Sequence, residues 1–504
     1  MLMKKIEKSQ KSKDEIQRSF SVRFTLRLWA LLHLAVWTIV PMMSNTCLPL
    51  DSVEAVSWGS QWQWGYDKHP PLSGWAAEIF HSAMGDAGIY FLAQLCVVLA
   101  GFGIYRIARL LELSKRQALF TVLVLDAVYF FQFAAVEFNV NIIQMPFWAW
   151  GWYFGIDALK NRKIASWVGL GLCVGLAALG KYLGVFLLAP LFGFWWSRGE
   201  LKSVLKSPGL YLAGFVAFLL FLPHLIWMAQ HDWCTLTYAM HRGGSEAAPW
   251  WGRIYYPLEF LLIQLAVLAP LVLLSLWSRF KYKGAQSVPG TIALALGGFV
   301  AMALIAVVGN IKPVDMWAAP MPLAIGLWLV PRFQLDQHPR AVFITTITMT
   351  LVFVLGYSIA YGLGPRFRKK PHRTNYPAHV LATATEQAWH QNYPFALDYI
   401  VADEFLGGIV NAYTKSRPAV MIRANLARSA YLTEAQVQKH GAIVLWLKSR
   451  NFLDKNQRSL KEIYPDLQTR FPTMRMLPDL IIPWPRRTDH RAGRYGLAII
   501  PPKS

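Results

Sequence analysis

Two carboxylates at helical spacing follow the first long apolar run of the chain. Asp51 and Glu54 are three residues apart, so in a helix they would share one face. A carboxylate held at a boundary between lipid and water can have a shifted pKa and can act as a general base. The same spacing also fits a solvated helix start with Glu54 in the first turn, so catalysis and capping both remain open.

A rigid turn lies just beyond these carboxylates. Lys68 and His69 precede Pro70-Pro71, and because proline fixes φ and blocks helix, the turn would hold both side chains in place. Apolar and aromatic residues recur at helical spacing through the loop 44–86. This pattern predicts two interfacial helices that lie on the membrane and are broken at the turn.

Polar residues also interrupt the apolar sequence at a predicted helix junction. Glu137, Asn139 and Asn141 stand where one apolar segment turns into the next. Such groups are costly in lipid and are expected to face a cavity. Glu137 together with Glu54 or His69 could bind a divalent metal ion, although the spacing does not bring these ligands together. No other cofactor is suggested.

Cations form a further group at predicted helix ends, on the same side as the carboxylates. One possible role of a cation at such a position is to anchor the helix end, with the charged group reaching the interface. The other is to pair with a phosphate. Because this group runs against the positive-inside trend, an anionic ligand such as a lipid phosphate is favoured. The cations are Lys181, Arg242, Arg253 and Lys312, and the aromatic neighbours are Tyr182 and Trp317.

The composition excludes several protein classes. The chain has 504 residues, of which 55% are hydrophobic, and it contains 22 tryptophans. Apolar runs of this length predict a polytopic helical membrane protein. A net charge of +22 would suggest nucleic-acid binding in a soluble protein, but here the cations are spread over short loops, as topology signals are. We therefore expect no nucleic-acid partner. The cysteines match no zinc or redox motif, and Cys47 and Cys234 could pair or stay free.

Apolar segments of roughly 20 residues, the length that crosses hydrocarbon, number about eleven. The basic loops between them fall on the side of the basic segment 1–23, which carries no cleavage site for a signal peptidase. We therefore predict a retained anchor with a cytoplasmic N-terminus and, after an odd number of spans, a C-terminus on the outer face. The predicted spans are 24–43, 87–110, 117–135, 140–159, 164–180, 182–197, 209–228, 254–278, 289–309, 317–332 and 340–362.

The last part of the chain has a different pattern. Short β-like runs alternate with helical stretches at 404–414 and 434–439, which predicts a small α/β domain. The predicted strands are 399–402, 419–422, 442–447, 480–482 and 497–500. We therefore divide the chain into a basic N-terminus (1–23), a transmembrane domain (24–362) with a first outer loop (44–86), and a C-terminal soluble domain (363–504).

Several motifs then occur in a fixed order. After the acidic pair come Gly65-Tyr-Asp-Lys-His-Pro-Pro71, Ala177-Ala-Leu-Gly-Lys-Tyr-Leu-Gly184, Leu222-Pro-His-Leu-Ile-Trp227, and Lys312 followed by Trp317. In this order the chain resembles the polyprenyl-phosphate-dependent glycosyltransferases of the GT-C fold. It is most similar to the bacterial branch that includes lipid A aminoarabinose transferases and lipopolysaccharide galacturonosyltransferases, and more distantly to protein O-mannosyltransferases. The resemblance covers about residues 20–330.

The resemblance implies an enzyme of the bacterial inner membrane with a periplasmic active site and periplasmic C-terminal domain. The donor would be a sugar on a polyprenyl phosphate. Asp51 would be the base that deprotonates the acceptor, with Glu54 as a second acidic residue. Many members carry these acids side by side, whereas Ser52 and Val53 separate them here, so either could be the base.

The same resemblance implies that Lys181, Arg242 and Lys312 neutralise the leaving phosphate, and the other candidate residues are assigned from their positions in the sequence. Donor phosphate would be bound by Lys181, Arg242, Lys312 and Tyr182. Substrate would contact Lys68, His69, Glu137, Asn139 and Trp317.

Three functions are compatible with this pattern. The first is transfer of a monosaccharide to lipid A or lipopolysaccharide core, with one base, phosphate-neutralising cations and inversion at the anomeric carbon. The second is transfer from the same donor to a protein. The third is transport or flipping of a lipid-linked sugar, which internal repeats would favour, and none is evident. The expected partners are the lipid-linked donor, the acceptor and membrane lipids, and the protein is expected to be a monomer.

Overall fold

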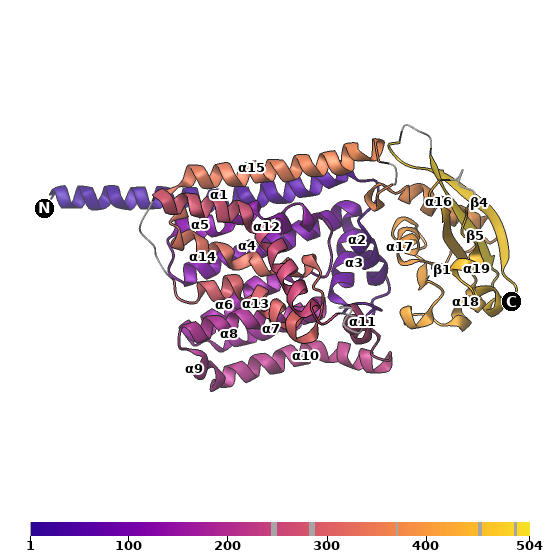
Figure 1. The fold of residues 1–504 in the computed structure, drawn as a ribbon, viewed down its shortest axis with the longest axis horizontal. Coiled ribbons are helices and arrows are strands. Elements are labelled where there is room, and N and C mark those ends of the chain that lie inside the picture. Colours follow the sequence, from indigo (N-terminus) through magenta and orange to yellow (C-terminus); the bar gives the residue numbers. More distant parts are fainter. Residues whose placement is uncertain are drawn as a thin grey trace.

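The computed structural model describes residues 2–242, 249–281, 288–368, 371–451, 456–487 and 491–503, with side chains described from residue 21 and not at 280 and 281. A bundle of helices fills one part of the molecule, and a mixed sheet with short helices caps one end of it (Figure 1). The longer helices of the bundle are α1 (Leu2–Ser44), α4 (Asp86–Leu110), α6 (Met145–Asn161), α7 (Ile164–Gly180), α10 (Pro208–Gln230), α12 (Gly252–Lys281), α13 (Thr291–Gly309) and α15 (Pro339–Tyr357).

Shorter helices complete the bundle and the loop that follows α1. The loop contains α2 (Leu50–Gly59) and α3 (Leu72–Met84), and the bundle adds α5 (Lys115–Leu123), α8 (Leu188–Ser197), α9 (Leu201–Leu205), α11 (Cys234–Arg242) and α14 (Ile325–Arg332). Some of these helices adjoin 3-10 turns: Val124–Ala127 follows α5, and Tyr182–Leu187 precedes α8.

Six helices of the described chain are long and apolar enough to cross a membrane, and a bent pair at 115–136 would make a seventh. The bend of 91° comes at Val128, inside the predicted span 117–135. The predicted span 140–159 starts late, because α6 begins only at Met145, after an irregular segment that carries Glu137, Asn139 and Asn141. Helices α7 and α8 are apolar but short. The number of about eleven spans therefore stays a prediction.

The loop 44–86 contains two helices separated by the turn at Pro70-Pro71, as predicted. Helix α2, however, is buried along Ser52–Gly59. Its close contacts are protein: a Cβ on Gly408 would lie 2.6 Å from Cγ1 of Val53. The expectation that α2 lies on a lipid surface is therefore wrong, because helices on both sides cover it.

A five-stranded sheet forms the C-terminal region, with strand order β2-β1-β3-β5-β4. The strands are β1 (Tyr399–Ala402), β2 (Ala419–Ile422), β3 (Ala442–Ser449), β4 (Arg475–Pro483) and β5 (Ala492–Ile500), and they lie where the sequence predicts strands. β1 is parallel to β2 and β3, and β5 is antiparallel to β3 and β4. The helices of this region are α16 (Ala378–His390), α17 (Glu404–Tyr413), α18 (Glu434–His440), α19 (Leu460–Ile463) and α20 (Leu467–Arg470).

The two faces of the sheet belong to two different cores. Ile400 and Leu497 point to the face whose buried cluster continues into the helix bundle. Val401 and Ala498, on the alternate face, pack in a separate cluster with residues of α18 to α20. The sheet is therefore fixed to the bundle by a shared apolar core, and its status as an independent domain stays a prediction.

Candidate active site

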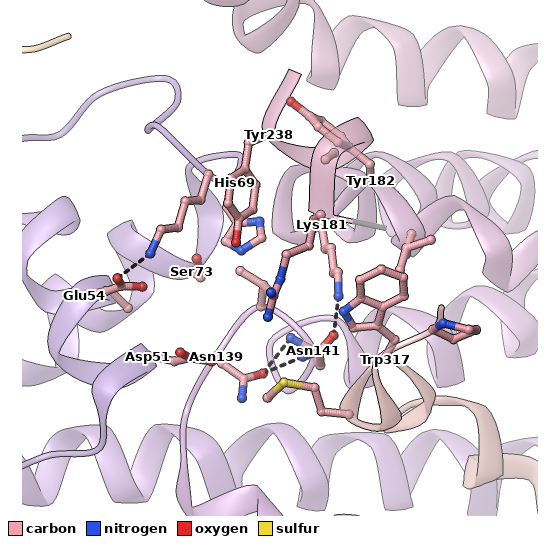
Figure 2. Close-up of a pocket in the computed structure, with 18 of the residues that line it drawn as sticks. Asp51, Glu54, His69, Ser73, Asn139, Asn141, Lys181, Tyr182, Tyr238 and Trp317 are labelled. Carbon is pink, nitrogen blue, oxygen red and sulfur yellow. Dashed lines mark hydrogen bonds and ion pairs between the residues drawn. The ribbon is translucent and has the colours of Figure 1, made fainter. Parts of the chain in front are cut away.

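A cavity of about 420 Å³ lies between the loop 44–86 and the neighbouring helix ends. It is lined by residues of α2, the turn before α3, the segment before α6, the turn after α7, helix α11 and the segment before α14. Figure 2 shows Asp51 and Asn139 on one side of this space and Lys181 and Trp317 on the other. Side chains far apart in the sequence thus converge on one place.

Much of the cavity wall is apolar. Met302, Ile305 and Ala306 of α13 contribute to it, together with Val140 and Leu183. Apolar walls exclude water and strengthen every electrostatic interaction inside. A ligand with both an apolar and an anionic part would match such a lining.

Glu54 is engaged in an ion pair at the edge of the cavity. Nζ of Lys68 donates a hydrogen bond of 2.6 Å to Oε1 of Glu54, and lies 3.7 Å from Oε1 of Glu404 at the start of α17. Burial raises the pKa of Glu54 to about 7, against the lowering effect of Lys68. Glu404 of the C-terminal region thus contacts the loop 44–86 through Lys68.

Asp51 stands in the first turn of α2, where the helix dipole favours a carboxylate. In the described part of the chain its carboxylate has no hydrogen-bond or ion-pair partner. Burial raises the pKa of Asp51, while Lys68 and Lys181 lower it, followed by Arg373 and Arg242. Asp51 is therefore a cavity carboxylate that is free to accept a proton and is surrounded by positive charge.

Glu137 stands next to the start of α2. Its Oε1 accepts a hydrogen bond of 3.2 Å from the backbone N–H of Asp51. Burial raises the pKa of Glu137 to about 7, and the charge of Asp51 adds to this. Glu137 is not among the residues that line the cavity. Glu137 therefore contacts the start of helix α2 from outside the cavity.

Lys181 is the buried cation of the cavity. Helix α7 ends at Gly180, so Lys181 has extended backbone and its side chain turns back into the cavity. Its Nζ donates a 2.7 Å hydrogen bond to Oδ1 of Asn141 and lies 4.9 Å from the centroid of the Trp317 ring. Burial lowers the pKa of Lys181 to about 7, although Asp51 raises it. Any anion bound here would restore its charge.

A hydrogen-bonded turn sets the position of Asn141. Oδ1 of Asn139 accepts from the backbone N–H of Asn141 at 2.8 Å and from its Nδ2 at 3.2 Å. The Nδ2 of Asn139 in turn donates to the carbonyl of Glu137 at 3.0 Å. This turn delays the start of α6 and aims Oδ1 of Asn141 at Lys181.

His69 lies in an aromatic wall of the cavity. Its ring meets those of Trp58 and Tyr238 edge to face, with centroids 6.0 Å and 5.8 Å away. Burial lowers the pKa of His69 well below its usual value, and Lys181 and Lys68 lower it further. His69 is therefore neutral at pH 7 and suits hydrogen bonding rather than charge pairing.

The predicted phosphate-binding residues do not all converge. Arg242 and Tyr182 line the cavity with Lys181, but the Tyr182 hydroxyl is bound to Nε2 of His224 at 2.9 Å. Lys312 does not line the cavity: its Nζ lies 3.0 Å from Oε2 of Glu259, and its side chain is 58% exposed. A direct role of Lys312 in phosphate binding thus stays a prediction without support from its position.

The three candidate metal ligands are not brought together. Glu54 is paired with Lys68, and Glu137 lies outside the cavity lining. Among the described residues, no group of three or more His, Cys, Asp or Glu side chains could hold a metal ion. Cys47 and Cys234 are free thiols.

Several site residues have no signal in the sequence. Tyr238 and Ser73 line the cavity, and Arg373 acts on Asp51 through its charge. Arg373 and Glu404 follow the last predicted span, so only the packing of the C-terminal region brings them near the loop. Arg428 reaches the loop as well: its Nη2 lies 2.8 Å from Oδ2 of Asp67.

Comparisons with known proteins agree with this architecture. Residues 68–227 match the model of the family described as dolichyl-phosphate-mannose-protein mannosyltransferase. The structure resembles the crystal structure of ArnT from Cupriavidus metallidurans bound to undecaprenyl phosphate, with a TM-score of 0.59, 14% identity, and coverage of 94% of this chain and 97% of that chain. A further similar structure is the mycobacterial arabinofuranosyltransferase AftD, with a TM-score of 0.45, 12% identity, and coverage of 95% of this chain and 42% of that chain. No curated protein sequence matches the chain at a significant level.

The resemblance found in the sequence is confirmed. The family match covers the segment from Lys68 to Trp227, which contains Lys181, and the ArnT likeness extends over nearly the whole chain. The chain therefore has the fold of ArnT, and its segment 68–227 matches a family of membrane glycosyltransferases.

Proposed function

We propose that this enzyme transfers a monosaccharide from a polyprenyl-phosphate donor to lipid A or to lipopolysaccharide core on the periplasmic face of the bacterial inner membrane. The observation that carries the proposal is the carboxylate of Asp51, which has no partner among the described residues and shares a partly apolar cavity with Lys181 and Arg242. The likeness to an ArnT that binds undecaprenyl phosphate supports the choice of donor class.

The proposed reaction uses each of these groups once. Asp51 accepts the proton of the acceptor hydroxyl, whose oxygen forms a bond to the anomeric carbon as the bond from that carbon to the phosphate oxygen breaks. The electron pair of the broken bond leaves with the polyprenyl phosphate, whose charge is stabilised by Lys181 and Arg242. A single displacement of this kind inverts the anomeric centre.

Asp51 is preferred over Glu54 as the base. Glu54 accepts a 2.6 Å hydrogen bond from Lys68, so its lone pairs are partly occupied. Asp51 has no such partner among the described residues. Glu54 and Lys68 instead define the edge of the cavity next to the C-terminal region.

A protein acceptor is the second candidate, because the matching family model describes protein mannosyltransferases. Mass spectrometry of lipid A and core from a deletion strain separates the two. Loss of a pentose, hexose or uronic acid substituent would name the sugar and support a lipid acceptor. Unchanged lipid A and core, together with loss of sugar from periplasmic proteins, would replace it with the protein acceptor.

A further inference from the structure

A second cavity, of about 460 Å³, lies between α1 and α4 at the opposite end of the bundle. Five of its eight lining residues are cations, and none is a carboxylate. The lining is Arg23, Leu26 and Arg27 of α1, Phe102, Tyr105, Arg106 and Arg109 of α4, and Lys115 at the start of α5. This end of the bundle is the one from which α1 extends towards the N-terminus (Figure 1).

The cavity lies at the level where a membrane has its headgroups. The candidate span within α1 begins at Ser21, and the span formed by α4 ends at Leu110. Arg23 and Arg109 are therefore within one turn of these ends, at the boundary between hydrocarbon and water.

Apolar side chains continue the same helix faces into the span. Arg23, Arg27 and Leu31 are four residues apart on α1, so they follow one another along one face. Arg106, Phe102 and Leu99, at spacings of four and three residues, likewise lie along one face of α4. Leu31 is 66% exposed and Leu99 is 40% exposed, so both are accessible to lipid chains.

The described carboxylate just beyond the end of α4 is already engaged. Glu112, beyond the end of α4, lies 2.7 Å from Nζ of Lys160. Arg106 is held in place, since its Nη2 donates a 3.0 Å hydrogen bond to the Tyr153 hydroxyl. The positive-inside trend accounts for the sign of these charges, but not for their convergence on a cavity that Leu26 and Phe102 also line.

We propose that this cavity binds the phosphate headgroup of an anionic phospholipid, whose acyl chains lie along Leu31 and Leu99. A headgroup with two phosphates, as in cardiolipin, would use more of the five cations than a single phosphate. Basic pockets between helices at a membrane surface recognise lipids in this way. The site is separate from the sugar-transfer cavity and does not depend on its function.

Native mass spectrometry of the purified full-length chain tests the proposal, with cardiolipin and phosphatidylcholine as probes. The test variant is Arg23→Gln/Arg27→Gln/Arg106→Gln. Its matched control is Lys163→Gln/Lys202→Gln/Lys206→Gln, which removes three exposed cations at the same end of the bundle. We expect cardiolipin, but not phosphatidylcholine, to bind the wild type.

The test variant should bind cardiolipin more weakly by on the order of 100-fold, and the control should bind as the wild type does. Equal losses in the two triple variants, or no loss in the test variant, would overturn the proposal. Binding of inorganic phosphate without binding of cardiolipin would also overturn it, because it would assign the site to free anions. If the triple variant does not insert, Arg27→Gln against Lys163→Gln gives the same comparison.

Discussion

Nζ of Lys68 lies 2.6 Å from Oε1 of Glu54, although the two residues are separated by the end of α2 and an irregular turn. This pair distinguishes two carboxylates that the sequence leaves equivalent. Glu54 is bound by a cation that also approaches Glu404, whereas Asp51 is open to the cavity. Glu54 is therefore held in an ion pair, whereas the Asp51 carboxylate has no such partner among the described residues.

Removing the ion pair between Asp67 and Arg428 should destabilise the protein. The Asp67 side chain is only 5% exposed, so Asp67→Asn leaves the Arg428 guanidinium without its buried partner, at a cost of about 3 kcal/mol. The matched control is Asp398→Asn, since Asp398 and His440 form an exposed pair of 2.8 Å whose loss should cost less than about 1 kcal/mol. Thermal unfolding in detergent measures both, and equal effects would show that the Asp67 pair does not fix the loop.

Gly59→Ala should displace α2 from α3. A Cβ at this position would lie 2.1 Å from the backbone oxygen of Gly74, which has no flexible end to move away. We expect a lower melting temperature and loss of transfer activity, because α2 carries Asp51. Gly214→Ala in α10 is the control: it has open space, and alanine is the better helix former, so stability should be unchanged or higher. An active, stable Gly59→Ala variant would contradict the close packing of α2 on α3.

Affinity for undecaprenyl phosphate should fall as the pH rises above about 7. Burial lowers the pKa of Lys181 to about 7, so its charged form is complete below that value and is lost above it. If only the charged form binds the phosphate, affinity falls by up to about tenfold per pH unit. Lys181→Arg keeps its charge and can still stack on Trp317, so its affinity should stay nearly constant from pH 7 to 9. Parallel pH profiles for the two proteins would remove Lys181 from phosphate binding.

Lys312 and Lys181 should differ in their effect on the donor lipid. Lys312 is exposed and paired with Glu259 outside the cavity, so Lys312→Gln should change the affinity for undecaprenyl phosphate by less than about twofold. Lys181→Gln removes a cavity cation and should lower the affinity by at least about tenfold. Titration of the lipid by microscale thermophoresis measures both, and a larger loss from Lys312→Gln would restore it to the phosphate site.

The sequence predicts local structure well where one physical signal dominates. Alternating and continuous apolar runs locate all five strands, and the proline pair separates α2 from α3. The burial of α2 could not be predicted, because its cover comes from α17, about 350 residues further along the chain. An apolar helix face looks the same whether lipid or protein covers it.

The sequence predicts which residue types form the site better than it predicts which side chains contact one another. Asp51, Lys181 and Trp317 do line one cavity. Lys312 does not, although its neighbours Ile311 and Pro313 do, because side-chain direction in an irregular segment follows no period. The ion pair of Lys68 with Glu54 and the approach of Glu404 depend on tertiary packing that no spacing in the sequence specifies.

We propose that Asp51, and not Glu54, is the base. The most direct test is the transfer rate of purified Asp51→Asn and Glu54→Gln variants with saturating polyprenyl-phosphate sugar and acceptor, on protein whose folding and donor binding have been checked. Asp51→Asn should lower the rate by about 10²- to 10⁴-fold with the donor still bound. Glu54→Gln should keep a substantial fraction of the rate, because the amide oxygen can still accept the hydrogen bond from Lys68. Full activity of Asp51→Asn together with an inactive, folded Glu54→Gln would exclude Asp51 and make Glu54 the base.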